Sequence, residues 1–184
     1  MTAITKINRS PRKSALLPVL KAIRLFATDV DGVLTDAGMY YSETGDEWKK
    51  FNTRDGMGIK LLQKAGVITA IVTQERTKLV ARRAEKLAIP ELHQGVMDKL
   101  SLIRQMAGRY GLSLREVAYI GDDINDLEAL EAVGFSAAPA DGMASVLATV
   151  DYVCKTKGGE GAVREIAEMI LAAQRPSTAR ARRR

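Results

Sequence analysis

Short apolar runs alternate with segments of helical periodicity along most of the chain. The runs that predict strands are residues 24–30, 67–72, 117–120, 133–137 and 152–154. The segments in which Leu, Ile, Val and Ala recur at helical spacing are residues 58–65, 77–87, 99–110, 125–132 and 161–173. Strands that alternate with helices favour a parallel sheet with right-handed crossovers. The predicted fold class is therefore α/β, a Rossmann-like parallel sheet with helices on both faces.

Residues 37–52 interrupt this alternation. Tyr40 and Tyr41 precede a polar stretch that contains Gly45, and a second aromatic run follows at residues 48–51. A Gly-containing turn between two such runs predicts a β-hairpin that projects from the first strand. Its aromatic side chains either pack within the hairpin or form an interface between subunits.

Both ends of the chain differ from its middle. The chain has 184 residues and is 46% hydrophobic, enough for one domain with a real core. The ends are basic and lack apolar periodicity, which is typical of tails. We expect a basic N-terminal tail over residues 1–21, one folded domain over residues 22–174 and an Arg-rich tail over residues 175–184.

The net charge of +6 comes from the ends. Of the 28 Lys and Arg residues, six lie in residues 1–24 and five in residues 175–184, so the part between holds 17 against all 22 acidic residues. The folded part is acidic, whereas a nucleic-acid groove needs basic residues on the folded face. No nucleic-acid partner is therefore expected.

Cysteine content and hydropathy indicate a cytoplasmic protein. Cys154 is the only cysteine, so the chain has no internal disulfide and needs no oxidising compartment. Residues 15–27 are mildly apolar, but Lys21 and Arg24 interrupt them. This segment is too short for a bilayer and too charged for a signal-peptide core. No membrane association is expected.

Polar residues stand at the ends of the predicted strands, where ligands bind in open α/β sheets. Asp29 and Asp31 follow the first strand, Thr73 the second and Asp122 the third, while Lys99 precedes the third. Carboxylates crowded in this way repel one another, and a divalent cation is the natural compensation.

Magnesium fits this all-oxygen set of ligands. We expect Asp29, the backbone carbonyl of Asp31 and Asp122 to hold the cation, which leaves positions for water and phosphate oxygens. Thr73 and Lys99 would bind the other phosphoryl oxygens. Such a site holds a phosphoryl group in line and neutralises its charge during transfer.

Simpler structural roles remain open for these residues. Asp122 or Asn125 could serve only as a helix N-cap, and Thr73 could cap the helix that begins near residue 77. Lys99 could be a solvated helix residue. A single cap explains neither the doubled aspartates at 122 and 123 nor Asp126.

Four motifs together resemble the haloacid dehalogenase phosphatases. They are DxDGxxTD at residues 29–36, the lone Thr73, Lys99 and GDDxND at residues 121–126. The resemblance implies that Asp29 is the nucleophile and that an aspartyl phosphate forms on it. It implies that Asp31 first donates a proton to the leaving alkoxide and then activates water.

In the same resemblance Asp122 binds Mg²⁺, with Asp123 and Asp126 just outside the metal ligands. Asp126 is expected to orient either Lys99 or the ligands around the metal.

A finer resemblance covers almost all of residues 22–173. The segments 52–56, 94–99 and 157–165 resemble the 3-deoxy-D-manno-octulosonate 8-phosphate phosphatases and their nonulosonate 9-phosphate relatives. This resemblance implies a homotetramer without a cap domain, in which hairpins make the contact and neighbouring subunits help close the substrate site. It implies a role in synthesis of a lipopolysaccharide sugar if the substrate is the octulosonate. The substrate-binding residues that we expect are Asn52, Thr53, Arg54, Asp55, Gly56, Lys60, Glu75, Arg83 and Lys86.

One departure concerns the substrate. The octulosonate enzymes usually carry Thr-Gly-Arg at the second motif, whereas this chain reads Thr73-Gln74-Glu75. A glutamate there is similar to the nonulosonate 9-phosphate type, and Lys86 would then supply the cation for the sugar carboxylate. The sequence therefore favours a nonulosonate 9-phosphate, with octulosonate 8-phosphate as the alternative.

Two functions of other classes stay open. A phosphoacceptor receiver also clusters aspartates, a Thr and a Lys on a parallel sheet, but the DxDGxxTD spacing and the late GDDxND argue against it. A non-catalytic interaction protein could keep this fold for assembly alone. The presence of every expected catalytic residue argues against that.

Overall fold

The computed structural model describes residues 13–175. The predicted tails therefore lie partly outside the described residues, at 1–12 and 176–184.

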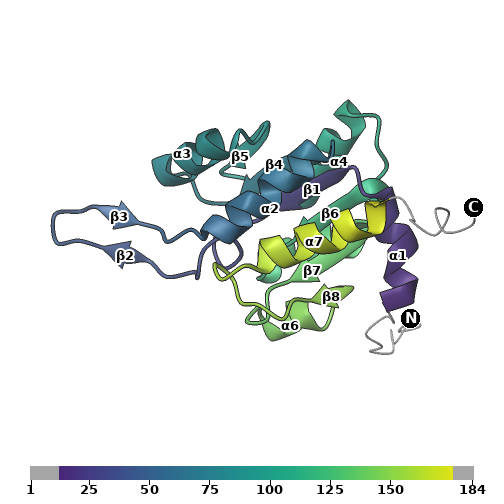
Figure 1. The fold of residues 1–184 in the computed structure, drawn as a ribbon. Helices are drawn as coiled ribbons and strands as arrows, with labels where there is room; N and C mark the ends of the chain where they lie inside the picture. The colour runs from purple at the N-terminus through teal and green to yellow at the C-terminus, as the bar shows by residue number, and fades with distance from the viewer. Residues whose placement is uncertain (1–12, 176–184) are drawn as a thin grey trace, which may run out of the picture.

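A six-stranded parallel sheet forms the centre of the protein (Figure 1). Its strand order is β5-β4-β1-β6-β7-β8. β1 lies centrally and pairs with both β4 and β6. Its four residues are all buried, as expected of an apolar strand with helices on both faces. The strands are β1 Leu25–Thr28, β4 Ile68–Thr73, β5 Glu91–Gln94, β6 Val117–Ile120, β7 Phe135–Ala138 and β8 Tyr152–Val153.

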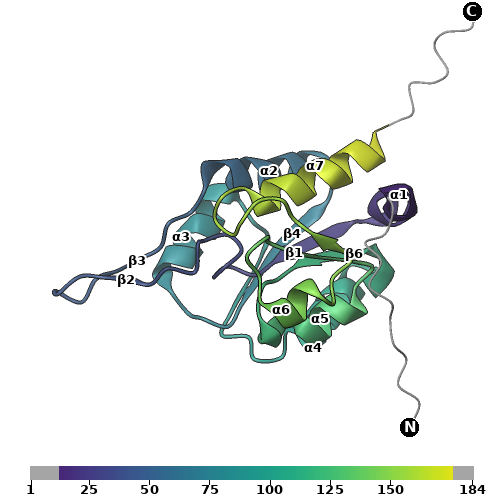
Figure 2. The same cartoon turned by 90° about the horizontal axis from the view of Figure 1, so that it is seen from below.

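Helices cover both faces of the sheet, which confirms the predicted fold class (Figure 2). The longer helices α2 and α7 lie side by side on one face, with α1 and α3 contributing to the same core. α4, α5 and α6 enclose a second core on the other face. The helices are α1 Lys13–Ala22, α2 Thr53–Lys64, α3 Lys78–Leu87, α4 Lys99–Arg109, α5 Leu127–Ala132, α6 Ala144–Leu147 and α7 Ala162–Gln174, with 3-10 turns at Leu114–Glu116 and Ile124–Asp126.

The N-terminal boundary of the domain differs from the expected one at residue 22. Residues 13–22 form α1, which packs against α7. Leu16 and Leu20 are one helical turn apart, and both are buried in the core that α7 shares. Basic residues surround this apolar pair in the sequence, so the helix was not predicted. The folded domain therefore begins before residue 22, and residues 13–21 are not part of a tail.

Three other elements also depart from the sequence pattern. Strand β5 was not predicted because Glu91 and His93 occupy it and none of its residues is fully buried, as befits an edge strand. The four-residue helix α6 was also missed. Helix α2 begins at Thr53, earlier than expected, because the Asn52 side chain caps it by accepting from the Arg54 amide.

The predicted hairpin is present and extends away from the body (Figure 1). Its strands are β2 Tyr40–Tyr41 and β3 Glu47–Trp48, which pair antiparallel. Tyr41 is 68% exposed and Trp48 65% exposed, so neither packs on its own chain. The chain from β4 to α4 holds only α3 and β5, so no cap domain is inserted among the described residues, as predicted.

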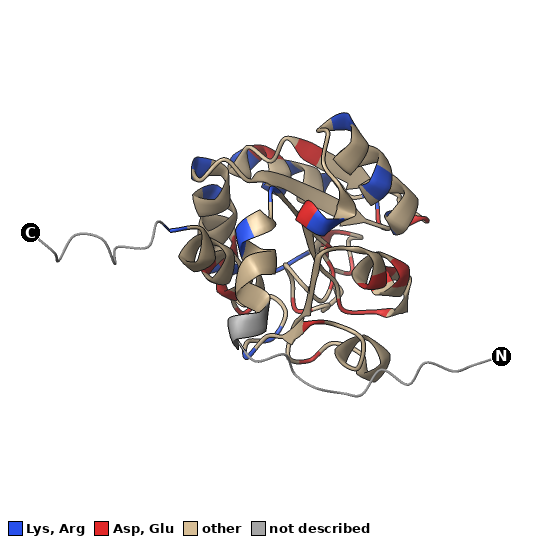
Figure 3. Cartoon of the chain, turned by 90° about the vertical axis from the view of Figure 1, so that its right-hand side faces the viewer, with Lys and Arg blue, Asp and Glu red and all other residues tan. Residues whose placement is uncertain are grey.

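Charged residues are distributed over several elements. In Figure 3 the Lys and Arg positions are interspersed with Asp and Glu along the described chain. None of the helices within residues 13–175 has the length and apolar character that crossing a membrane requires.

Candidate active site

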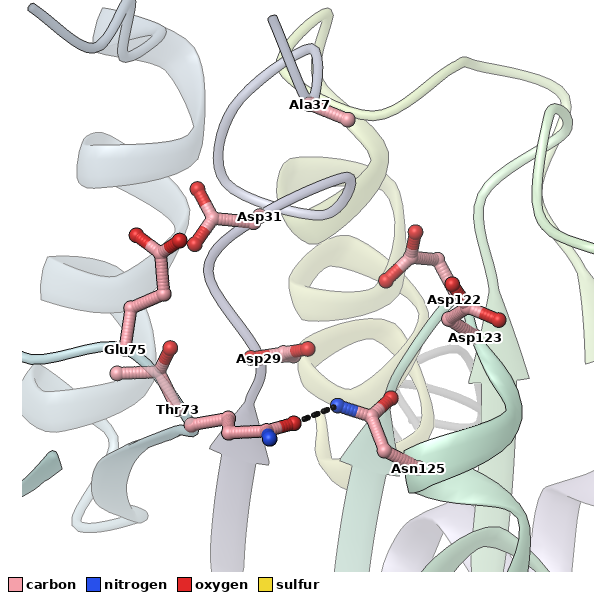
Figure 4. A pocket seen from close by; sticks show the side chains of 9 residues that line it. Asp29, Asp31, Ala37, Thr73, Glu75, Asp122, Asp123 and Asn125 are labelled. Atoms are coloured by element: carbon pink, nitrogen blue, oxygen red, sulfur yellow. Dashed lines mark hydrogen bonds between the residues drawn. The ribbon is translucent and has the colours of Figure 1, made fainter. Parts of the chain in front are cut away.

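Three predicted catalytic residues, Asp29, Asp31 and Thr73, line a cavity of about 520 Å³ at one edge of the sheet, and the fourth, Lys99, binds Asp29. Figure 4 shows Asp29 in the middle, with Asp31, Thr73 and Glu75 on one side and Asp122 and Asp123 on the other. The residues that line the cavity are Asp29, Asp31, Ala37, Thr73, Gln74, Glu75, Asp122, Asp123 and Asn125.

Strand pairing brings these side chains together. β1 lies between β4 and β6, and the Asp29 amide donates to the carbonyl of Ile120 at 3.0 Å. The turn after Asp29 then needs a glycine. Gly32 has φ +78°, and a Cβ atom there would collide with the Asp122 carboxylate. This glycine lets the loop approach Asp122 closely.

Lys99 forms the buried floor of the site. Its Nζ donates to Asp29 Oδ2 at 2.8 Å and to Asp126 Oδ1 at 2.6 Å, and the residue is 2% exposed. Burial acts to lower the pKa of Lys99, but attraction to the two carboxylates outweighs it, so the pKa is raised. The lysine therefore stays charged and is not a solvated helix residue.

Asp126 is saturated with hydrogen-bond donors. Its Oδ1 accepts from Lys99 and from the Tyr119 hydroxyl at 2.5 Å, and its Oδ2 accepts from the amides of Asp122 and Asp123 at 3.0 and 3.3 Å. The side chain is fully buried. Asp126 thus binds Lys99, and its carboxylate also lies near those of Asp29 and Asp122, so both roles that the resemblance implies for it stay predictions.

The carboxylates form a site that suits a divalent cation. Oxygen atoms of Asp29, Asp122 and Asp126 lie within 4.8 Å of one another. Burial and repulsion from Asp126 raise the pKa of Asp29 to about 7, although Lys99 opposes them. Burial and repulsion from Asp29 and Asp126 raise the pKa of Asp122 to about 8. Because donors already occupy Asp126, the shared negative charge of Asp29 and Asp122 is what a cation would neutralise.

The simpler roles of Thr73 and of the GDDxND motif do not hold. Thr77, not Thr73, caps helix α3, and Thr73 faces the cavity while only 2% exposed. Asp123 caps the turn that begins at Ile124, so neither Asp122 nor Asn125 has that role.

Sequence reasoning missed three residues that line the cavity, Ala37, Gln74 and Asn125, and one that contacts its carboxylates, Lys49. Lys49 follows β3, and its Nζ donates to Asp31 Oδ1 at 2.5 Å and to Glu75 Oε2 at 2.9 Å. The Lys49 side chain is 1% exposed. Burial acts to lower its pKa, but the bonds to Asp31 and Glu75 outweigh this and raise it. A sequence signal existed, because Lys49 alternates with the exposed Trp48 and thus points to the other side of the hairpin.

Of the expected substrate-binding residues, Glu75 alone lines the cavity among the described residues. Asp55 is fully buried, and its Oδ1 accepts from the Arg164 amide at 2.9 Å, so it caps helix α7 from α2. Asn52 donates to the carbonyl of Gly159 at 3.1 Å, which ties α2 to the loop before α7.

The remaining expected residues lie beside the cavity or outside it. Arg83 donates to the carbonyl of Asn52 at 2.8 Å and lies over the Phe51 ring, 5.5 Å from its centroid. Gly56 packs against Arg83, since a Cβ there would meet the guanidinium at 2.6 Å. Contact with substrate stays a prediction for these two residues, for Asn52, Asp55 and Glu75, and for four exposed residues, Thr53, Arg54, Lys60 and Lys86.

Comparison with known proteins identifies the family. The family model for haloacid dehalogenase-like hydrolases matches residues 84–166. The 3-deoxy-D-manno-octulosonate 8-phosphate phosphatase of Yersinia pestis is 43% identical over 83% of this chain and 81% of its own length. The enzyme of the same name from Escherichia coli K12 is 38% identical over 89% of this chain and 87% of its own length.

A solved structure resembles the whole fold. The octulosonate phosphatase of Moraxella catarrhalis, in complex with a magnesium ion, a phosphate ion and a KDO molecule, superimposes with a TM-score of 0.86. It is 40% identical, and the match covers 89% of this chain and 94% of that one. The chain therefore belongs to the haloacid dehalogenase-like hydrolases, and the predicted class of enzyme, a phosphatase, is that of its relatives.

Proposed function

We propose that this hydrolase removes the phosphate from 3-deoxy-D-manno-octulosonate 8-phosphate with the help of Mg²⁺. The observation that carries the proposal is the 2.8 Å bond between the buried Lys99 and Asp29, at the floor of a cavity lined by carboxylates. Lys99 binds Asp29 Oδ2, and the Val30 amide donates to Asp29 Oδ1 at 2.7 Å, so the carboxylate that lines the cavity is held in a fixed orientation.

In the first half of the reaction, an oxygen of Asp29 attacks phosphorus and the bond from phosphorus to the sugar oxygen breaks. Asp31 donates a proton to that oxygen, so the sugar acid leaves as an alcohol. Asp29 now carries the phosphoryl group. Thr73 and Lys99 bind its other oxygens from the sheet edge.

In the second half, water attacks phosphorus and Asp31 takes a proton from it. The bond between phosphorus and the Asp29 oxygen breaks, which releases inorganic phosphate and restores both aspartates. The two roles of Asp31 require that its carboxyl group reach into the cavity, which it lines.

The residues present fit Mg²⁺. Asp29, Asp122 and the backbone carbonyl of Asp31 would hold it. Burial and repulsion between carboxylates raise the pKa values of Asp29 and Asp122 although Lys99 binds Asp29, and a cation would relieve that repulsion. When bound, the ion neutralises the charge that spreads over the phosphoryl oxygens. The magnesium and phosphate in the Moraxella catarrhalis structure support this assignment.

The choice of substrate departs from the one that the sequence favoured. Glu75 suggested a nonulosonate 9-phosphate, whereas the similar enzymes named above act on octulosonate 8-phosphate. Glu75 differs in charge from the arginine that the octulosonate enzymes usually carry at this position. Lys49 reduces this difference, because its Nζ lies 2.9 Å from Glu75 Oε2 and offsets the negative charge. We therefore propose the octulosonate as substrate and keep the nonulosonate as the comparison in the test.

The assembly that we propose is a homotetramer joined through the hairpins. The exposed Tyr41 and Trp48 support it, because an isolated two-stranded hairpin is only marginally stable in water. Other subunits would cover these rings and bring additional residues to the substrate site.

The test of function measures phosphate release from octulosonate 8-phosphate and from a nonulosonate 9-phosphate. We expect a higher kcat/KM for the octulosonate, loss of activity with a chelator and its return with Mg²⁺. Asp29→Asn should abolish turnover, because an amide is a poor nucleophile, and acid quenching of the wild type should trap an aspartyl phosphate. Full activity of Asp29→Asn would refute the mechanism, and a preference for the nonulosonate would refute the substrate.

A further inference from the structure

Lys49 reaches the candidate active site from an element outside the sheet. The other charged residues of the site stand at the ends of β1, β4 and β6 or at the start of α4, whereas Lys49 directly follows β3 of the hairpin. Its ammonium lies between Asp31 and Glu75, which come from different strands. Figure 4 shows these two carboxyl groups close together on the same side of the cavity.

Burying the Lys49 ammonium costs free energy of desolvation. Well-placed bonds to Asp31 and Glu75 offset this cost. The Lys49 side chain is 1% exposed, while those of Asp31 and Glu75 are 30% and 45% exposed. A buried ammonium requires well-placed partners. Without it, the two carboxylates would repel each other and turn apart toward solvent, because neither is enclosed.

We propose that Lys49 is a positioning residue for the leaving-group end of the reaction. It holds the Asp31 carboxyl group where the sugar ester oxygen lies and holds Glu75 where it can accept hydrogen bonds from the neighbouring sugar hydroxyls. The inference rests on the proposed function, because it uses the role of Asp31 toward an alkyl ester. It also connects the hairpin, the expected site of subunit contact, to the chemistry.

The leaving group distinguishes this role from a general structural one. The alkoxide of an octulosonate is a poor leaving group, so its departure needs a proton from a correctly placed Asp31. In this proposal the sugar hydroxyls face Glu75. p-Nitrophenolate is a stable anion without hydroxyls, so its departure needs neither contact. Formation of the aspartyl phosphate should therefore depend on Lys49 with the sugar acid phosphate and hardly at all with p-nitrophenyl phosphate.

The experiment is rapid-quench and stopped-flow kinetics on Lys49→Met, Lys49→Arg and a matched control. We expect Lys49→Met to slow aspartyl phosphate formation from octulosonate 8-phosphate by about tenfold to hundredfold. The burst of p-nitrophenolate should stay within about twofold of the wild type, and Lys49→Arg should recover part of the loss. The control is Lys50→Met, which removes the same charge from an exposed side chain whose ion pair within residues 13–175 is with Asp36, at 2.7 Å.

Four outcomes decide the matter. Equal losses with both substrates, or no loss in Lys49→Met, overturn the proposal. Equal losses in Lys50→Met and Lys49→Met also overturn it, since general charge would then explain them. Wild-type enzyme that is inactive on octulosonate 8-phosphate refutes the proposed function instead. The same comparison is then made between p-nitrophenyl phosphate and glycerol phosphate, in which the alkyl leaving group still tests Lys49.

Discussion

The Lys99 ammonium lies 2.6 Å from Asp126 Oδ1, and the two side chains are 1% and 0% exposed. Asp126 thus carries the negative charge that keeps Lys99 protonated beside Asp29 without itself facing the cavity. Because two backbone amides and Tyr119 also bind Asp126, its carboxylate is held in a fixed position beside the Lys99 ammonium.

Asp126→Asn should impair both stability and catalysis. The amide leaves the buried Lys99 without one of its two charged partners, which typically costs about 3–5 kcal/mol of unfolding free energy. Chemical denaturation measures the stability, and phosphate release measures the activity. Tyr119→Phe should have a smaller effect, because it removes one hydrogen-bond donor to Asp126 and keeps the charge of Asp126. We expect it to lower the free energy of unfolding by about 1 kcal/mol. Equal stability of Asp126→Asn and wild type would contradict this account.

Glu75→Ala should weaken recognition of sugar acids. Glu75 is the only expected substrate-binding residue within residues 13–175 that lines the cavity, and its loss removes an acceptor for sugar hydroxyls. We expect kcat/KM for octulosonate 8-phosphate to fall by roughly tenfold to two-hundredfold, or about 1–3 kcal/mol. Gln74→Ala, at the next cavity position, should have the smaller effect. Unchanged kcat/KM in Glu75→Ala would exclude contact with the substrate.

Removing the exposed hairpin aromatics should disrupt assembly. We expect wild-type protein to be tetrameric by light scattering and the double variant Tyr41→Ser with Trp48→Ser to be smaller, because the buried apolar area of the interface is lost. Val153→Ser, at an exposed apolar position on β8, should leave the mass unchanged. A monomeric wild type at assay concentration would contradict the tetramer.

Asp55→Ala should destabilise the fold without removing a group from the cavity. The Asp55 carboxylate caps α7 through the Arg164 amide, and α2 and α7 form an extensive helix contact. Loss of such a cap costs about 1–2 kcal/mol. Denaturant titration of Asp55→Ala beside Glu160→Ala, an exposed acidic residue in the preceding loop, measures the difference. Comparable stability of the two variants would show that the cap contributes nothing.

Glu165 should make stability depend on acidic pH. Burial acts to raise its pKa, but bonds from Tyr152, Lys155 and Thr156 outweigh this, so the native pKa lies below 4.5. A lowered native pKa means that the contribution is present above pH about 4.5 and is lost as the pH falls through the native value. Glu165→Gln should therefore lower the free energy of unfolding by about 1 kcal/mol at pH 7, which lowers Tm, and should lower both much less at the acidic end.

Glu168→Gln is the matched control on the same helix, since its side chain is 62% exposed and its ion pair among the described residues is with Arg164. Its Tm difference from the wild type should be small throughout. A Tm difference for Glu165→Gln that grows on acidification would reverse the sign argued here.

The sequence by itself determined every strand of the sheet except β5, most of the helices and the edge of the sheet that carries the reactive residues. Apolar runs that end in Asp29, Thr73 and near Asp122 identify parallel strands, and parallel strands end at the same edge. The position of these residues thus follows from local pattern plus one rule of topology. The same reasoning found the hairpin, because its turn and its aromatic runs are contiguous in the chain.

Only the tertiary structure decided which partners the remaining charged residues have. Lys49 binds Asp31 and Glu75, 18 and 26 residues away, and Asp55 caps a helix 109 residues away. Helix α1 belongs to the domain because α7 covers Leu16 and Leu20. Periodicity reports which face of an element is apolar, but it carries no information on which distant element covers that face or which charges meet there, because long-range packing sets both.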